Sequence, residues 1–152
     1  MSKPKIGTIA AVSTPAGRSA ISLIRISGPD TFKILKKLFI TGGKKAFPLP
    51  YSAYFGTIIE PETGLVADKC VVTTFLAPRS YTGENVAEIS THGNPVVTAR
   101  VMQLLLKNGA RAAEAGEFTR RAFLHGKMDL LEVEAVAQLL SANTSSQARL
   151  AL

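Results

Sequence analysis

Cysteine is nearly absent from this chain, which has only Cys70 among its 152 residues. A single cysteine excludes an internal disulfide and a zinc site built on several cysteines, and it is compatible with a reducing compartment. Long apolar runs are also missing, because no segment approaches the roughly 20 residues that a membrane-spanning helix needs. The apolar start at Ile6–Val12 is broken by Pro15 and Arg18, and no cleavage-like segment follows. We therefore expect a soluble, unexported protein of the cytosol.

Several motifs of catalysis are absent too. Gly43-Lys44-Lys45 and Gly126-Lys127-Met128 lack the earlier glycine and the following Ser or Thr of a Walker A phosphate loop. There is no Gly-x-Ser-x-Gly elbow, and Cys70 lies in a predicted strand, where a thiol usually packs as a small hydrophobic group. His92 and His125 have no carboxylate or cysteine at a metal-ligand spacing, so turn or capping roles are favoured for them. The sequence thus offers no triphosphate cradle, no covalent nucleophile and no metal centre.

The composition, with 46% hydrophobic and 19% charged residues, is typical of a globular protein. This length fits one domain plus, at most, a short appendage. The net charge of +7 is concentrated in residues 1–45, with +8, and residues 100–127, with +4. These basic segments could meet a polyanion, so a nucleic-acid-docking module stays open as an alternative. A solvated helix face at Lys33, Lys36 and Lys37 is the simpler interpretation.

The periodicity of the chain indicates an α+β fold with a mixed sheet and packed helices. Alternating apolar residues predict five strands, of which the third and fourth form a hairpin: Ile6–Val12, Ala20–Ile26, Tyr54–Ile59, Lys69–Phe75 and Asn85–Thr91. Helical spacing predicts a helix after Asp30 that carries Phe32, Leu35, Leu38 and Phe39 on its apolar side.

Three more helices are expected in the second half of the chain. The first is Asn94–Lys107, with Asn94 as cap, Pro95 in the first turn and Asn108-Gly109 as the stop. The second is Glu117–His125, and the third begins at Asp129 with Glu132 as a capping box.

The end of the chain is expected to begin a second domain. We place the first domain at 1–127 and the start of a truncated helical domain at 128–152, which would make the chain the front piece of a longer protein. Four apolar residues of this tail would form an exposed stripe: Leu130, Val133, Val136 and Leu140. The tail should therefore be disordered, displaced or covered by another chain.

The chemistry of the chain is carried by polar residues at the ends of regular elements. Period two places Arg25 at the end of an apolar row and Glu88 on a strand face among small neighbours. Together with Lys127 they supply one carboxylate and two cations, which can recognise a polar ring with an anionic tail. Thr82-Gly83-Glu84 and Gly116-Glu117-Phe118 accompany them in the sequence. Taken from the residues alone, a simple ion pair between Arg25 and Glu88 is the favoured alternative.

These residues resemble the amino-terminal part of the MnmE/TrmE family of tRNA-modification GTPases. The resemblance covers most of the chain and is weakest at 42–69. It is carried by several stretches in the family's order, namely Thr8-Ile9-Ala10-Ala11, Thr14-Pro15-Ala16-Gly17-Arg18, Arg25-Ile26-Ser27-Gly28, Ser80-Tyr81-Thr82-Gly83-Glu84-Asn85, His92-Gly93, Glu117-Phe118-Thr119-Arg120-Arg121-Ala122-Phe123-Leu124 and Gly126-Lys127-Met128-Asp129-Leu130.

The resemblance implies a domain that binds folate and forms a homodimer, with the fold of the tetrahydrofolate domains of aminomethyltransferases. Arg25, Glu88 and Lys127 match the family's folate-contacting positions, and Thr82, Glu84, Glu117 and Arg121 are weaker candidates from the same motifs. The expected ligand is a 5-formyl- or 5,10-methylene-tetrahydrofolate. We expect its site to lie close to the dimer interface.

The resemblance also implies a larger protein with partners. That parent modifies C5 of the wobble uridine of tRNA together with a FAD-dependent protein, and a tetrahydrofolate supplies the one-carbon unit. Its GTP-binding domain, with GTP, Mg and K, and its Cys-x-Gly-Lys tail are missing from this chain. We therefore expect no GTPase activity here and no contact with a membrane, and the nucleic-acid alternative becomes a basic tRNA-docking module without a small-molecule ligand.

Overall fold

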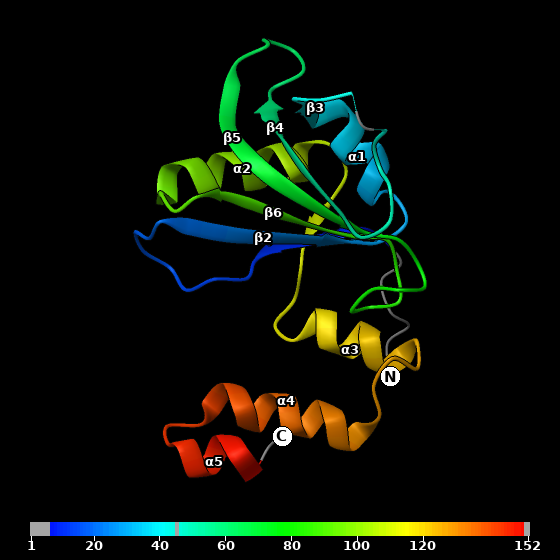
Figure 1. The fold of residues 1–152 in the computed structure, drawn as a ribbon, viewed down its shortest axis with the longest axis vertical. Helices are drawn as coiled ribbons and strands as arrows, with labels where there is room; N and C mark the ends of the chain where they lie inside the picture. The colour runs from blue at the N-terminus through cyan, green and yellow to red at the C-terminus, as the bar shows by residue number, and fades with distance from the viewer. Residues whose placement is uncertain (1–6, 45, 151–152) are drawn as a thin grey trace.

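The structure, a computed structural model, describes residues 7–44 and 46–150. Seven strands form one mixed sheet in the order β3-β4-β5-β6-β2-β1-β7 (Figure 1). Every neighbouring pair is antiparallel except β1 and β7, which are parallel. The strands are β1 (Ile9–Val12), β2 (Ile21–Ser27), β3 (Phe39–Thr41), β4 (Ser52–Ile59), β5 (Val66–Phe75), β6 (Val86–His92) and β7 (Arg111–Ala112). The predicted α+β class with a mixed sheet is confirmed.

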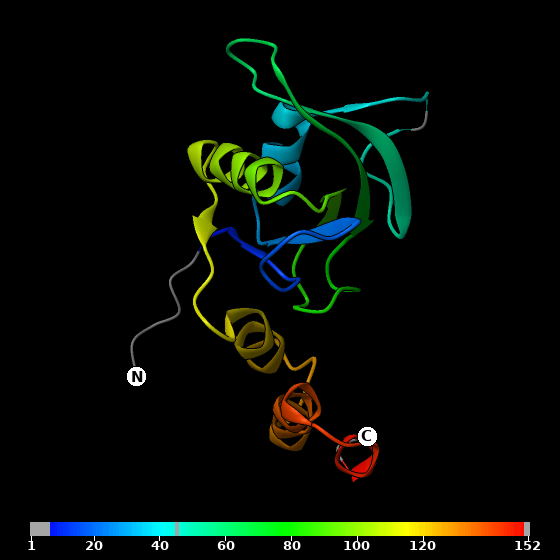
Figure 2. The same ribbon diagram turned by 90° about the vertical axis from the view of Figure 1, so that its left-hand side faces the viewer.

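Two helices cover one face of this sheet, α1 (Thr31–Leu38) and α2 (Pro95–Lys107) (Figure 2). The alternation of β2 explains why, because its even-numbered residues, such as Ile24 and Ile26, point into the core and are fully buried. They pack with Ile89 of β6 and Leu104 of α2 in a single hydrophobic cluster. The helices therefore bury the apolar rows of the central strands.

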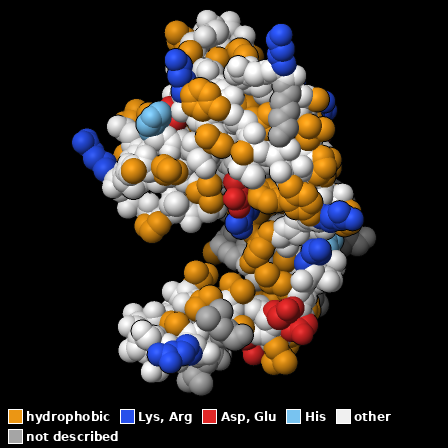
Figure 3. Space-filling view, in the orientation of Figure 1, with side chains coloured by type: hydrophobic (Ala, Val, Ile, Leu, Met, Phe, Trp, Pro, Cys, Tyr) orange, Lys and Arg blue, Asp and Glu red, His pale blue; other side chains and the backbone are white. Residues whose placement is uncertain are grey.

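The other face of the sheet is largely open. It carries the odd-numbered side chains of β2 and the even-numbered ones of β6, and it leaves Ile21, Phe55 and Val71 exposed. Figure 3 views this side and shows hydrophobic side chains reaching the surface over the sheet. Arg25 and Glu88 belong to this same face, at the end where the loop 76–85 and α3 (Glu117–Leu124) approach it.

The helix predicted at Asn94–Lys107 is confirmed in detail. The Asn94 side chain accepts a hydrogen bond from the Val96 N–H at 2.9 Å, and Pro95 occupies the first turn. After Asn108, Gly109 has φ +111°, a conformation that glycine adopts without a Cβ penalty. Local signals are sufficient here because capping groups and the stop lie within the segment itself.

The structure corrects several predicted boundaries and adds one strand. The helix after Asp30 ends at Leu38, and Phe39 is extended and begins β3, because it pairs with Ile58. Strand β5 begins at Val66 rather than Lys69. Strand β7 was not predicted at all: the Arg111 N–H donates to the Thr8 carbonyl at 2.9 Å, a contact between distant segments. The first predicted strand begins at Ile9, and Ile6 lies outside the described residues.

The C-terminal helices lie away from the sheet (Figures 1 and 2). Helix α4 (Leu130–Ser141) has the predicted capping box between Asp129 and Glu132, and it packs on α3 and on α5 (Ser145–Leu150). Leu130 and Leu140 of its apolar stripe are exposed. This agrees with the expected displacement of the tail from the sheet. Among the described helices, none has both the length and the apolar character to cross a bilayer.

Candidate functional site

Arg25 and Glu88 face each other across two central strands. They are direct partners in the antiparallel register of β2 and β6. Arg25 Nε and Nη2 both donate to Glu88 Oε1, at 3.1 and 2.8 Å, and both side chains keep about a quarter of their surface exposed. Among the described residues, no hydrogen bond to the second oxygen, Oε2, is found. The ion pair that the sequence favoured on its own is therefore present, and it leaves one carboxylate oxygen uncommitted.

Two aromatic rings border the Arg25 guanidinium. Its central carbon lies 4.9 Å from the ring centre of Tyr81 in the loop 76–85 and 5.6 Å from that of Phe118 in α3. The Tyr81 hydroxyl is hydrogen-bonded to Thr119 Oγ1 at 2.9 Å, so the loop and the helix are joined beside the ion pair. Sequence reasoning did not select these two rings. Both rings lie in motifs that carry the family resemblance, and this was the one feature of the sequence that could have identified them.

Lys127, which follows α3, lies against the loop 76–85 and away from the ion pair. A Cβ on Gly83 would meet Lys127 Cγ at 3.3 Å and Cδ at 3.5 Å, so the stem of this lysine passes over the turn that follows Tyr81 and Thr82. Its backbone N–H donates to the Ala122 carbonyl at 2.8 Å, which ends α3 beside that turn. The exposed ammonium group has no ion pair with a described carboxylate. Arg25 and Glu88 are thus brought together, and Lys127 is placed against a turn of the adjacent loop.

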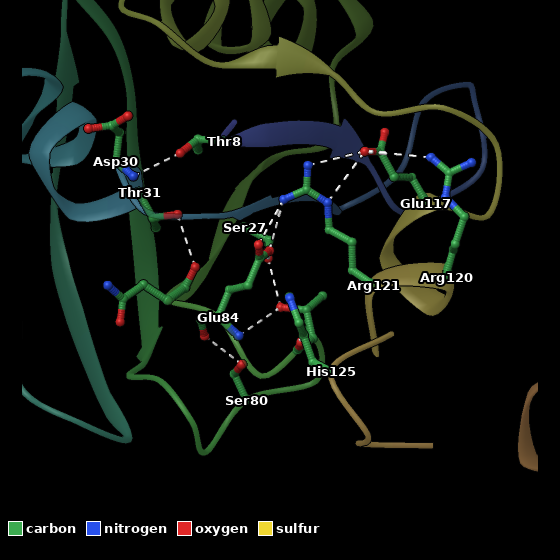
Figure 4. A network of polar contacts seen from close by, with 12 residues as sticks. Thr8, Ser27, Asp30, Thr31, Ser80, Glu84, Glu117, Arg120, Arg121 and His125 are labelled. Carbon is green, nitrogen blue, oxygen red and sulfur yellow. Dashed lines mark hydrogen bonds and ion pairs between the residues drawn. The ribbon is translucent and has the colours of Figure 1, made fainter. Parts of the chain in front are cut away.

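The four weaker candidates form a second, buried network (Figure 4). Ser27 Oγ is 2.7 Å from Thr82 Oγ1 and donates to Glu84 Oε2 at 2.7 Å. Arg121 Nη1 donates to both oxygens of Glu84, at 2.9 and 3.0 Å, and its Nε and Nη2 donate to Glu117 Oε1 at 3.3 and 3.1 Å. Thr82, Glu117 and Arg121 are buried. Their polar groups are used within the chain, so this network fastens the loop 76–85 and α3 to the sheet.

Glu117 is the most strongly held acid of this network. Hydrogen bonds from Arg111, and further ones from the Glu114 N–H and Arg121, outweigh its burial and lower its pKa from 4.5 to about 2. The carboxylate therefore stays charged in the folded protein at any pH above about 3. A charge that is buried and fully paired in this way supports the structure, and it is not a proton donor at neutral pH.

The other titratable groups offer little chemistry. Burial raises the pKa of the Cys70 thiol to about 12, so it is not a thiolate nucleophile. His125 Nδ1 is 2.7 Å from the Thr82 carbonyl, and His92 Nδ1 is 2.7 Å from Asp68 Oδ1, as turn-fixing contacts. In the described part of the chain, no group of three or more His, Cys, Asp or Glu could hold a metal ion.

The basic segment 100–127 is mostly neutralised within the fold. Five of its cations pair with carboxylates, namely Arg100, Lys107, Arg111, Arg120 and Arg121. Their charge holds the hairpin β4–β5 and helix α3 in place. This use within the chain weakens the tRNA-docking alternative, because paired cations release fewer counterions from a polyanion.

Known protein families and curated proteins include sequences similar to this chain. The family model described as "GTP-binding protein TrmE N-terminus" matches residues 8–127. The "tRNA modification GTPase MnmE" of Ligilactobacillus salivarius is 48% identical over 146 residues, which are 95% of this chain and 31% of that protein. The proteins of the same name from Carboxydothermus hydrogenoformans and from Streptococcus pyogenes are each 43% identical, over 95% of this chain and 32% and 31% of their own length.

This chain spans about a third of the length of these relatives. The matched region begins at Thr8, directly before β1, and ends at Lys127, so it contains the whole sheet, α3 and every candidate site residue. The chain therefore belongs to the TrmE/MnmE family of tRNA-modification GTPases and represents its N-terminal domain.

Proposed function

We propose that this domain binds a tetrahydrofolate derivative that carries a one-carbon unit, on the open face of the sheet at Arg25 and Glu88. The observation that supports the proposal is the uncommitted oxygen of Glu88, held beside a guanidinium and two aromatic rings. A carboxylate in such a place prefers a partner with N–H donors, because an unpaired acceptor in a partly buried site is costly.

The residues fit the chemistry of a reduced folate. The 2-amino and N3–H groups of a pterin are adjacent donors, and the uncommitted Oε2 of Glu88 could accept a hydrogen bond from them. Arg25 and Lys127 can stabilise oxo, formyl or tail oxygens. The buried network would support the site by holding the loop 76–85 and α3 in place; its members are Thr82, Glu84, Glu117 and Arg121. When bound, the ligand would supply the one-carbon unit, and the residues of this chain would bind and orient it.

A calorimetric titration with 5-formyl-tetrahydrofolate tests the proposal. We expect Glu88→Gln to weaken binding by roughly 10- to 100-fold, because a hydrogen bond to a charged group contributes about 1.5–3 kcal/mol. Gln keeps the shape of the side chain but presents only one acceptor oxygen and no charge.

The matched control is Glu62→Gln, which removes an exposed carboxylate on the distant β4–β5 hairpin and should leave the affinity unchanged. A thermal melt of both variants shows whether the fold is intact. Equal affinity of the wild type and Glu88→Gln would exclude Glu88 from folate recognition. No binding by the wild type would exclude the whole site.

The proposal extends to the longer protein that the relatives represent. We infer that residues 1–127 form the folate-binding and dimerising domain, and that α4 and α5, within 128–152, begin a helical domain. A homodimer, a cytoplasmic location, a FAD-dependent partner and modification of the tRNA wobble uridine belong to this proposal. It is supported by the family match over 8–127 and by the name that the relatives carry, "tRNA modification GTPase MnmE". Nucleotide hydrolysis is assigned to the part that this chain does not contain.

A further inference from the structure

Tyr81 and Phe118 come from different parts of the fold and meet at one guanidinium. Tyr81 lies in the loop 76–85 before β6, and Phe118 lies in the first turn of α3. Their ring centres are 4.9 and 5.6 Å from the central carbon of Arg25, within the range of a cation–π interaction. Both side chains are half-buried, so the rings are partly desolvated and partly accessible from the open face of the sheet.

We propose that Tyr81 and Phe118 are the positioning residues of the folate site, which hold Arg25 so that Glu88 keeps one oxygen for the ligand. This inference rests on the proposed function, because it explains how the site stays ready for an N–H donor. We call this pair of rings the aromatic clamp. It touches the guanidinium, and through the guanidinium it determines what Glu88 can accept.

The argument starts from the geometry that arginine and carboxylates normally prefer. A guanidinium fork tends to bind a carboxylate with two parallel hydrogen bonds, one to each oxygen. Here Arg25 Nε and Nη2 both donate to Oε1 instead. Attraction to two rings on the loop and helix side favours this one-sided arrangement. Without the rings, the Arg25 fork would be free to donate one hydrogen bond to each Glu88 oxygen. No Glu88 oxygen would then remain uncommitted for a ligand.

The clamp is itself firmly held. The Tyr81 hydroxyl is hydrogen-bonded to Thr119, the residue after Phe118, at 2.9 Å. On the loop side, Ser80 Oγ donates to the Glu84 carbonyl at 2.6 Å, and on the helix side Arg121 joins α3 to Glu84. The two rings are thus fixed by bonds that do not involve Arg25 or Glu88. A positioning role requires this independence, because the clamp must impose a geometry on the ion pair.

The test is a calorimetric titration of the 152-residue chain with 5-formyl-tetrahydrofolate. We expect Tyr81→Ala and Phe118→Ala each to weaken binding about tenfold, as for the loss of one cation–π contact. Tyr81→Phe keeps the ring and should recover most of the affinity. The matched control is Phe123→Ala, an exposed phenylalanine of the same helix that faces α4 and not Arg25, and it should bind as the wild type does.

A double-mutant cycle separates positioning from general stability. Arg25→Lys keeps a positive charge but removes the guanidinium fork that the rings orient, so Tyr81→Ala should have little further effect on affinity in this background. Full additivity of the two losses, or an equal loss in Phe123→Ala, would overturn the clamp. Failure of the proposed function looks different: the wild type would not bind, or Glu88→Gln would bind as tightly as the wild type.

Discussion

Replacing Glu117 by glutamine is expected to lower the free energy of unfolding by about 3–5 kcal/mol at pH 7, as for a buried ion pair that loses one partner. Glu117 is only 2% exposed and accepts hydrogen bonds from Arg111, Arg121 and the Glu114 N–H. Glutamine provides one acceptor oxygen and no charge. The Arg121 guanidinium, itself 6% exposed, would then lose half of its carboxylate partners.

The same residue should make stability depend on pH in the acid range. Its pKa is about 2 in the folded protein, against an ordinary value of 4.5, with the hydrogen bond from Arg111 as the main cause. The unfolded chain therefore binds the proton more readily between these two values. The contribution of Glu117 is fully present above about pH 5 and is lost as the pH falls toward 2. Urea unfolding at pH 7, 4 and 3 measures it.

The control for both effects is Glu114→Gln. Glu114 lies three residues away and pairs with Arg120, but both side chains are about half exposed. Exposed pairs contribute about 0–1 kcal/mol, so this variant should unfold almost as the wild type does and keep its pH dependence. If Glu117→Gln and the wild type lost stability in parallel on acidification, the pKa assigned to Glu117 would be wrong.

The second large effect is expected for Gly93→Ala. A Cβ at this position would lie 2.2 Å from the carbonyl oxygen of Ser19, far inside a normal contact. The approach is close because the Ser19 N–H donates to the Gly93 carbonyl at 2.9 Å and the Gly93 N–H donates to the Ala20 carbonyl at 3.2 Å. These bonds join the start of β2 to the end of β6. Relief of the clash must move backbone, which no side-chain rotation can avoid.

We expect Gly93→Ala to lower the free energy of unfolding by about 3 kcal/mol or more and the thermal midpoint by roughly 10 °C. The control is Gly43→Ala, where the added methyl group meets no atom within 4 Å. That variant should stay within about 0.5 kcal/mol of the wild type. Thermal melts followed by circular dichroism measure both variants. Equal midpoints for the two would contradict the close approach at Gly93.

Much of the fold could be predicted because its signals are local. The cap, proline and stop of α2 lie inside one segment, and the same holds for the capping box of α4. The end of α1 could not be predicted, because Phe39 leaves the helix to pair with Ile58. Strand β7 has two residues and exists through its pairing with β1. A strand this short depends on a partner far away in the sequence, as Arg111 does on Ile9, and periodicity does not reveal such a partner.

The candidate site divides in the same way. The alternation of β2 and β6 indicated that Arg25 and Glu88 project from strand faces, and the structure pairs them directly. Their folate role, with that of Lys127, stays a prediction. The sequence did not indicate that Tyr81 and Phe118 border Arg25, since these three residues are separated by dozens of positions.

The sequence by itself determined the strand faces, the capped helices and the charges available to the site. Only the tertiary structure decided which of those charges form ion pairs within the protein, because such pairing depends on distances between segments. Glu84, Glu117 and Arg121 neutralise one another in a buried network. Glu88 meets a guanidinium that uses a single oxygen. A carboxylate is free to bind a ligand only where the fold leaves it a lone pair, and that is a property of three-dimensional geometry.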